Sequence, residues 1–207
     1  KFNTQEEHEI GVFAEPAFFK IFDWKWLAGD SETALTEPNS VVLNQKMAEK
    51  CFDSWQAALG KTVLMDNAIL LTVRGVVANA PDNTDFPFHV IVSYETLKKN
   101  ADLYFYSNDW GSTSSNNQAY ALLHDASQFD AANASLASVG QAEYTKDNPN
   151  FTKTHHLQRL ADLHYDDRFG TTGTHVISKS RLWVLSLVGL LIVVMACFNF
   201  INLATAL

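Results

Sequence analysis

The pattern of hydrophobic and polar residues divides the chain into two parts. Charged residues are spread over residues 1–181, whereas the run from Leu182 to Leu207 contains none. At about 1.5 Å per residue, a helix over this run spans about 39 Å, which exceeds the ~30 Å hydrocarbon core of a bilayer. The run therefore predicts a transmembrane helix over 182–207, in preference to a buried helix of a soluble core.

The small and polar residues of this helix gather on one side when the sequence is drawn at 100° per residue. Small residues let helices approach closely in lipid, and Asn side chains can form hydrogen bonds across such a contact. We predict a helix-packing face, or alternatively two Asn side chains that meet the lipid headgroups. Its residues are Gly189, Ala196, Asn199, Asn202 and Ala206.

Shorter patterns in residues 1–181 indicate strands in pairs, interrupted by short helices. Alternating or continuously apolar runs bounded by turn residues predict strands over 9–13, 40–44, 62–65, 68–79, 88–94, 118–124 and 155–165. Helices are predicted after Asn44 and Ser93, which can act as N-caps, and from Ser127, where Asp130 suggests a capping box. Residues 24–40 read as irregular. This arrangement is typical of an α+β fold rather than regular βαβ alternation.

Composition narrows the functional classes. The formal net charge of −8 argues against a nucleic-acid partner, which would need a basic surface for the phosphates. A hydrophobic content of 47% argues against a disordered chain. The two cysteines, Cys51 and Cys197, fall in a predicted helix and in the apolar run, so no disulfide framework is indicated.

Motifs for catalysis or cofactor binding do not emerge. The LGKT stretch at 59–62 has Trp55 where a phosphate-binding loop needs Gly, so it is interpreted as a turn into a strand. Histidines and aspartates within 155–167 lack the spacing of a zinc site, and a solvated edge is the better interpretation. We therefore predict no catalytic residue, no cofactor and no metal.

One aromatic group lies beside the polar segment 111–118. Aromatic side chains at this density are usually core or sheet-edge residues, but they can also form a surface for a sugar or a protein. The candidate partner-binding patch consists of Tyr104, Phe105, Tyr106 and Trp110.

Three stretches together resemble a known family. FFKIFDWKWLAGDSETALTEPNSVVLNQKMAEKCF, LGKTVLMDNAILLTVRGVVANAPDNTDFPFHVIVS and ACFNFINLATA occur in this order. They are similar to segments of the MacB-like periplasmic core domain of FtsX-like ABC transporter permeases, most closely the Bacteroidetes-type members, and the last resembles the signature of the second transmembrane helix. The resemblance covers Ala14 to Leu207. Cys51 stands where the family pattern has an aromatic residue.

The resemblance implies a mixed α+β core with a porter-like subdomain, a smaller inserted subdomain and a following transmembrane helix. The expected divisions are a truncated first porter-like part (1–38), an insert (39–111), a second porter-like part (112–170), a linker (171–181) and the membrane helix (182–207). On this analogy, the preceding first membrane helix and the third and fourth helices lie outside the sequence.

The resemblance also implies a function without enzymatic activity in this chain. A separate ABC ATPase would drive the permease from the cytoplasm, and the membrane helices would transmit that motion to the periplasmic domain for export or extraction of a substrate. A periplasmic adaptor, an outer-membrane channel and a homo- or heterodimeric partner are expected, with the domain outside the bacterial inner membrane. The alternatives are an extracytoplasmic sensor domain of a receptor and a membrane-anchored surface-binding protein.

Overall fold

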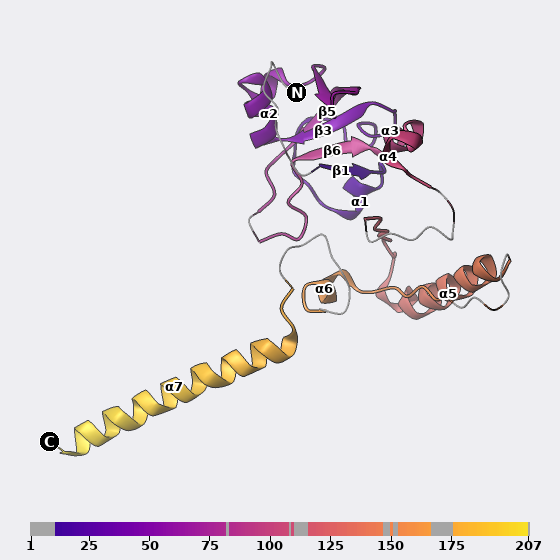
Figure 1. Cartoon of the computed structure of the whole chain (residues 1–207). Helices are drawn as coiled ribbons and strands as arrows, with labels where there is room; N and C mark the ends of the chain where they lie inside the picture. The colour runs from indigo at the N-terminus through magenta and orange to yellow at the C-terminus, as the bar shows by residue number, and fades with distance from the viewer. Residues whose placement is uncertain are drawn as a thin grey trace. The chain divides into compact units, whose positions relative to one another are not determined.

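The computed structural model describes residues 11–81, 83–107, 109, 116–146, 150, 153–166 and 176–206. The chain forms two compact units, Lys1–Leu157 and Gln158–Leu207. Over these residues, the first unit contains a mixed β-sheet with several helices, and the second contains a short helix and the long C-terminal helix (Figure 1). The predicted α+β fold is confirmed.

The described part of the first unit contains one six-stranded sheet with the strand order β1-β6-β3-β5-β2, in which β4 also pairs with β5. The pairs β1–β6 and β3–β5 are parallel, and the other neighbours are antiparallel. The strands are β1 (Gly11–Ala14), β2 (Trp26–Gly29), β3 (Ser40–Asn44), β4 (Thr62–Met65), β5 (Ile69–Val77) and β6 (Val90–Ser93).

Helices lie between these strands and after β6. The described helices of the first unit are α1 (Phe18–Ile21), α2 (Gln45–Phe52), α3 (Tyr94–Lys99), α4 (Ala101–Tyr104) and α5 (Phe129–Thr145), with the 3₁₀ turns η1 (Trp55–Ala57) and η2 (Ala126–Gln128). The second unit contains α6 (Leu160–Leu163) and α7 (Lys179–Ala206).

The central strand β3 is buried on both faces of the sheet, which explains its continuous apolar sequence. On one face, Val41 and Leu43 belong to a cluster that includes Met47 of α2. On the other face, Val42 belongs to a second cluster with Phe19 of α1. The sheet is therefore a middle layer between two apolar clusters, and both depend on β3.

Two predicted helix caps are confirmed. The Asn44 side chain accepts a hydrogen bond from the Met47 N–H at 2.8 Å, and the Ser93 hydroxyl accepts one from the Glu95 N–H at 3.3 Å. The LGKT stretch is also the predicted turn, because Gly60 has a φ of 76° and β4 begins at Thr62.

Several sequence predictions are wrong. Residues 118–124 contain no strand, and the predicted strand at 155–165 is instead an extended segment followed by α6. Strand β2 lies in the segment that was predicted to be irregular. The cap before α5 comes from Asp125, whose carboxylate accepts a hydrogen bond from the Ser127 N–H at 2.6 Å, rather than from Ser127 itself. A 3₁₀ turn therefore precedes the helix.

The expected division at residues 38 and 39 falls between β2 and β3, within the sheet. Strands β1 and β2 precede this division, but they pair with β6 and β5, which follow it. The porter-like and inserted parts thus share one hydrogen-bonded sheet over the described residues, and their assignment remains a proposal from the family analogy.

Candidate functional surfaces

Helix α7 is the most distinctive functional element. It contains 28 residues, has a mean hydropathy of 2.7 in its most apolar window, and has none of that window buried. Its length and composition are sufficient to cross a membrane. It begins at Lys179, so the last residues of the expected linker form its first turn. Trp183, close to this start, is 77% exposed, a position typical of aromatic residues at a membrane interface.

The predicted packing face lies along this helix. Its five residues, like all described α7 residues, are exposed in the single chain. A Cβ added at Gly189 would meet nothing within 4 Å. Since exposure does not separate this face from the rest of α7, the packing face remains a prediction from the sequence pattern.

A set of contacts in the second unit ties the start of α7 to α6. The Lys179 ammonium group lies 3.1 Å from the Asp162 carboxylate and 5.4 Å from the centre of the Tyr165 ring. The backbone N–H of Ile177 also donates a hydrogen bond to the carbonyl of His164 at 3.2 Å. We call Asp162, Tyr165 and Lys179 the stalk contact. It joins the first turn of α7 to the segment that precedes it.

The structure separates the residues of the predicted aromatic patch. The Tyr104 ring packs edge-on against Phe13, with ring centres 5.1 Å apart, and its hydroxyl donates a hydrogen bond to Asp66 at 2.9 Å. Partial burial, followed by this hydrogen bond, raises the pKa of Tyr104 above its ordinary value. Tyr104 is therefore half-buried and packs against the core of the sheet unit.

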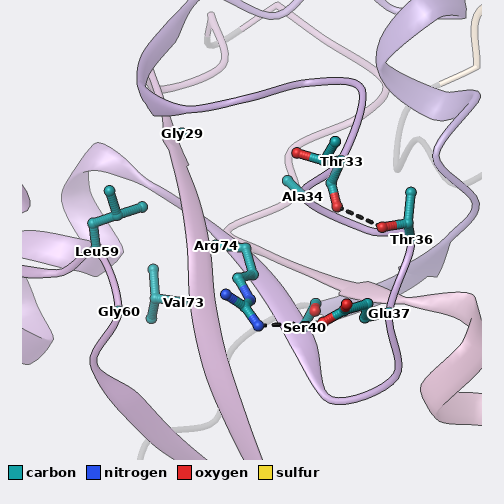
Figure 2. Close-up of a pocket in the computed structure, with 10 residues that line it drawn as sticks. All are labelled: Gly29, Thr33, Ala34, Thr36, Glu37, Ser40, Leu59, Gly60, Val73 and Arg74. Carbon is teal, nitrogen blue, oxygen red and sulfur yellow. Dashed lines mark hydrogen bonds and ion pairs between the residues drawn. The ribbon is translucent and has the colours of Figure 1, made fainter.

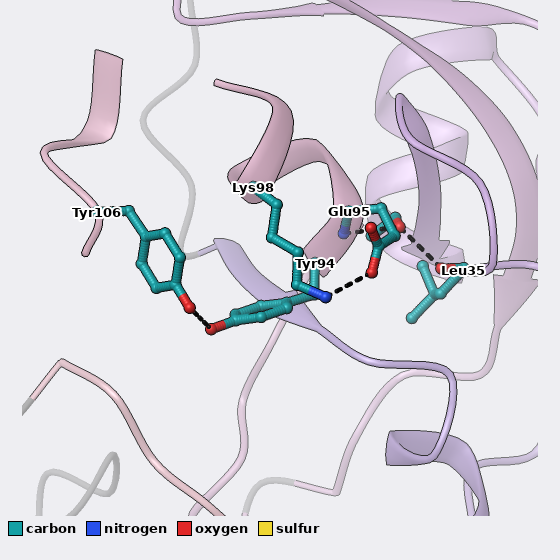
Figure 3. A network of polar contacts seen from close by, with 6 residues as sticks. Leu35, Tyr94, Glu95, Lys98 and Tyr106 are labelled. Atoms are coloured by element: carbon teal, nitrogen blue, oxygen red, sulfur yellow. Dashed lines mark hydrogen bonds and ion pairs between the residues drawn. The ribbon is translucent and has the colours of Figure 1, made fainter. Parts of the chain in front are cut away.

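Tyr106 is held by a different partner, Tyr94, on the first turn of α3 (Figure 3). The two hydroxyl oxygens are 2.6 Å apart, and desolvation with this hydrogen bond raises the pKa of Tyr94. Lys98 lies 5.3 Å from the centre of the Tyr94 ring and forms an ion pair with Glu95 at 2.7 Å. These contacts fix Tyr106 against the end of the sheet unit.

Phe105, between the two tyrosines, is 95% exposed. Trp110 lies outside the described residues. Of the three described patch residues, only Phe105 presents its ring to solvent, and the tyrosines beside it make internal contacts. The four residues are therefore not shown to form one surface.

Sequence reasoning did not identify an open pocket of about 470 Å³ beside β5 (Figure 2). The loop after β2 forms one wall, and an Asx-type turn at Asp30 shapes it, with the Glu32 N–H donating to the Asp30 carboxylate at 3.0 Å. The two charged residues that line the pocket, Arg74 and Glu37, contact each other at 3.3 Å. Their pairing leaves no net charge in the lining for attraction of an ion.

The histidine-rich segment makes ordinary side-chain contacts. His155 Nε2 lies 2.7 Å from the Tyr144 hydroxyl of α5, and the His164 ring packs edge-on against Tyr165. Among the described residues, no group of three or more His, Cys, Asp or Glu side chains could hold a metal ion.

Comparisons with known proteins decide the family. A model of the MacB-like periplasmic core domain matches residues 1–139, which is most of the sheet-containing unit. The chain belongs to the MacB-like periplasmic core domain family. It is thus related to a periplasmic domain of ABC transporter permeases, followed here by a helix long enough to anchor it in a membrane.

A solved structure at low sequence identity shares the fold. A domain assigned to a permease protein from Porphyromonas gingivalis is 16% identical, with a TM-score of 0.51, and the match covers 78% of this MacB-like chain and 74% of that one. The periplasmic region of MacB from Actinobacillus actinomycetemcomitans is 21% identical over 42% of this chain and 39% of that one, with a TM-score of 0.33. The comparison with curated proteins gave no match.

Proposed function

We propose that this chain is the periplasmic domain and second membrane helix of an ABC transporter permease subunit that transmits ATP-driven motion. Membership of the MacB-like periplasmic core domain family carries the proposal. The exposed helix α7 supports it, because a helix with no buried apolar window needs lipid or other membrane helices around it.

In this proposal, a separate ABC ATPase binds the permease on the cytoplasmic face of the inner membrane. Movement of α7 along or about its axis would reach the periplasmic part through the stalk contact, in which Lys179 pairs with Asp162. The periplasmic domain would then act on a substrate for export or extraction, together with an adaptor and an outer-membrane channel. The permease would work as a homo- or heterodimer, and α7 would run from the periplasm towards the cytoplasm.

The proposed packing face supplies a direct test in the full-length permease, co-expressed with its ATPase and purified in lipid nanodiscs. We expect the permease to raise ATP hydrolysis by the ATPase. Replacement of both Asn199 and Asn202 by Leu should reduce this stimulation several-fold, because interhelical hydrogen bonds in lipid are lost.

Ser186→Leu is the matched control, since it also replaces a polar side chain of α7 by Leu. Ser186 lies on the side of the helix opposite Asn199 and Asn202. The Ser186 hydroxyl donates to the Leu182 carbonyl at 2.8 Å, so its hydrogen bond is satisfied within the helix. This variant should keep normal stimulation. A full-length protein that binds no ATPase and stimulates none would refute the proposed function and favour a receptor or a surface-binding protein.

A further inference from the structure

Phe105 combines two features that are unfavourable for the folded chain. It is 95% exposed, so its ring gains almost nothing from burial. Its backbone φ is 51°, in the left-handed region that a bulky side chain rarely adopts. At the end of α4 this position is a helix C-cap, where Gly or Asn is usual because neither pays the same steric cost.

The surrounding contacts hold the residue in this conformation. The Tyr106 N–H donates a hydrogen bond to the Ala101 carbonyl at 2.9 Å, which closes the end of α4. On one side the Tyr104 hydroxyl bonds to Asp66, and on the other Tyr106 bonds to Tyr94 (Figure 3). The backbone is thereby fixed on both sides of Phe105, so the position of its Cα is set before a partner binds and only the rotamer of the ring has to be selected.

We propose that Phe105 is a preformed anchor that inserts into an apolar pocket of a protein partner with a basic rim. Aromatic anchors of this kind dominate the energy of many interfaces, and an anchor on a fixed backbone loses less conformational freedom on binding than one on a mobile loop. Retention of an exposed ring at a strained backbone position is explained if the contact with the partner compensates for both costs.

The charges near Phe105 select a protein rather than an anionic lipid surface. Asp102 lies in the first turn of α4, Asp66 accepts the Tyr104 hydrogen bond, and Asp109 accepts one from Ser107 at 2.7 Å. The last turn of α3 contributes two cations, Lys98, which is paired with Glu95, and Lys99, so the three aspartates keep the group at a net negative charge. This acidic surrounding would repel phosphatidylserine or phosphatidylglycerol headgroups and would complement lysines or arginines around a partner's pocket. The proposal does not depend on ATP-driven transmission.

The first experiment identifies the partner with the full-length protein in its native membranes. The photoreactive substitution Phe105→p-benzoylphenylalanine is irradiated, and the cross-linked protein is identified by mass spectrometry. Leu122, which is 68% exposed and is not among the positive-φ residues, provides the matched control position. The identified partner is then purified, and its Kd for the full-length protein is measured in detergent.

Two variants test the proposal, because each is expected to raise the stability of the protein and to weaken its binding of the partner. Phe105→Gly and Phe105→Asn remove the left-handed strain and should raise the Tm by about 2–4 °C. The same variants should weaken binding of the partner at least 10-fold, whereas Leu122→Asn should leave the Kd unchanged. A purely structural Phe105 would instead give a lower Tm and an unchanged Kd, which would overturn the proposal.

The remaining outcomes are also decisive. Cross-linking to lipid, or loss of binding to phosphatidylglycerol vesicles in the Phe105→Asn variant, would replace the protein partner by a membrane and refute the proposal. Cross-linking at position 105 only to the protein's own chain would refute it as well. Opposite shifts in Tm and affinity in both variants, with an unchanged control, would support it.

Discussion

Gly29 and Gly60 provide a test of how closely β2 approaches β5. Both glycines have left-handed backbones, with φ values of 87° and 76°. A Cβ at Gly29 would lie 2.3 Å from the Arg74 carbonyl oxygen and 2.8 Å from the Gly75 Cα, whereas a Cβ at Gly60 would meet nothing within 4 Å. The pair therefore shares the cost of a left-handed Ala and differs in crowding alone.

The magnitudes follow from this difference. The left-handed conformation costs an L-residue about 1–2 kcal/mol, and this applies to both Gly29→Ala and Gly60→Ala. Overpacking adds about 1–3 kcal/mol at Gly29. The upper part of that range applies, because β5 is also paired with β3 and cannot retreat without breaking that pairing. We expect a loss of about 3–5 kcal/mol for Gly29→Ala and about 1–2 kcal/mol for Gly60→Ala.

Hydrogen exchange measured by mass spectrometry on the detergent-solubilised full-length protein can resolve this difference locally. Peptides that cover β2 and the paired end of β5 should lose protection in Gly29→Ala, while Gly60→Ala should change them much less. Urea unfolding provides the global comparison. Equal losses of stability in the two variants, within about 0.5 kcal/mol, would refute the close approach of β2 to the β5 backbone.

Three further predictions concern a cap, two tyrosines and the stalk. Asn44→Ala should lower the free energy of unfolding by about 1–2 kcal/mol in urea titrations, and Asn44→Asp should restore most of it, since either side chain can accept the Met47 hydrogen bond. Burial raises the pKa of Tyr94 and Tyr104 in the folded state. The free energy of unfolding should therefore be unaffected below pH ~10 and fall above it, as the tyrosines of the unfolded chain ionise. Replacement of both tyrosines by Phe should reduce this fall when unfolding is measured as a function of pH. Lys179→Asp should reduce ATPase stimulation several-fold, and combination with Asp162→Lys should restore it if the stalk contact transmits motion.

The sequence predicted the buried centre of the sheet better than its edges. The runs at β3 and β5 are apolar because they pack against clusters on the sheet faces, and this requirement is visible in their residues. Strand β2 has four residues and joins the sheet through its approach to Gly75, which no local pattern indicates. The alternating residues at 155–165 are typical of a strand. In the structure, however, the Leu157 N–H donates a hydrogen bond to the Asn133 side chain of α5 at 2.7 Å, and not to a neighbouring strand.

The candidate surfaces show a similar division. An uncharged run of membrane-spanning length is a property of composition, so α7 was predictable. The fate of the aromatic patch was not predictable, because it depends on which partners Tyr104 and Tyr106 reach in space. Asp66 lies on the turn between β4 and β5, far from Tyr104 in the sequence, and only the folded sheet brings the two together. The left-handed backbone of Phe105 follows from the way α4 ends against these contacts.

Depth in the bilayer separates the two interpretations of the Asn residues on α7. With the hydrocarbon region beginning near Leu182, Asn199 lies about 25 Å along the helix and Asn202 about 30 Å, at about 1.5 Å per residue. A core of ~30 Å therefore encloses Asn199 and ends near Asn202. An amide within hydrocarbon needs a partner, whereas one at the boundary can meet water or headgroups. If α7 packs against other helices through this face, Asn199→Leu should reduce ATPase stimulation more than Asn202→Leu. Equal, negligible effects of both single variants would mean that the two amides meet headgroups, and α7 would then be an anchor whose packing depends on its small residues.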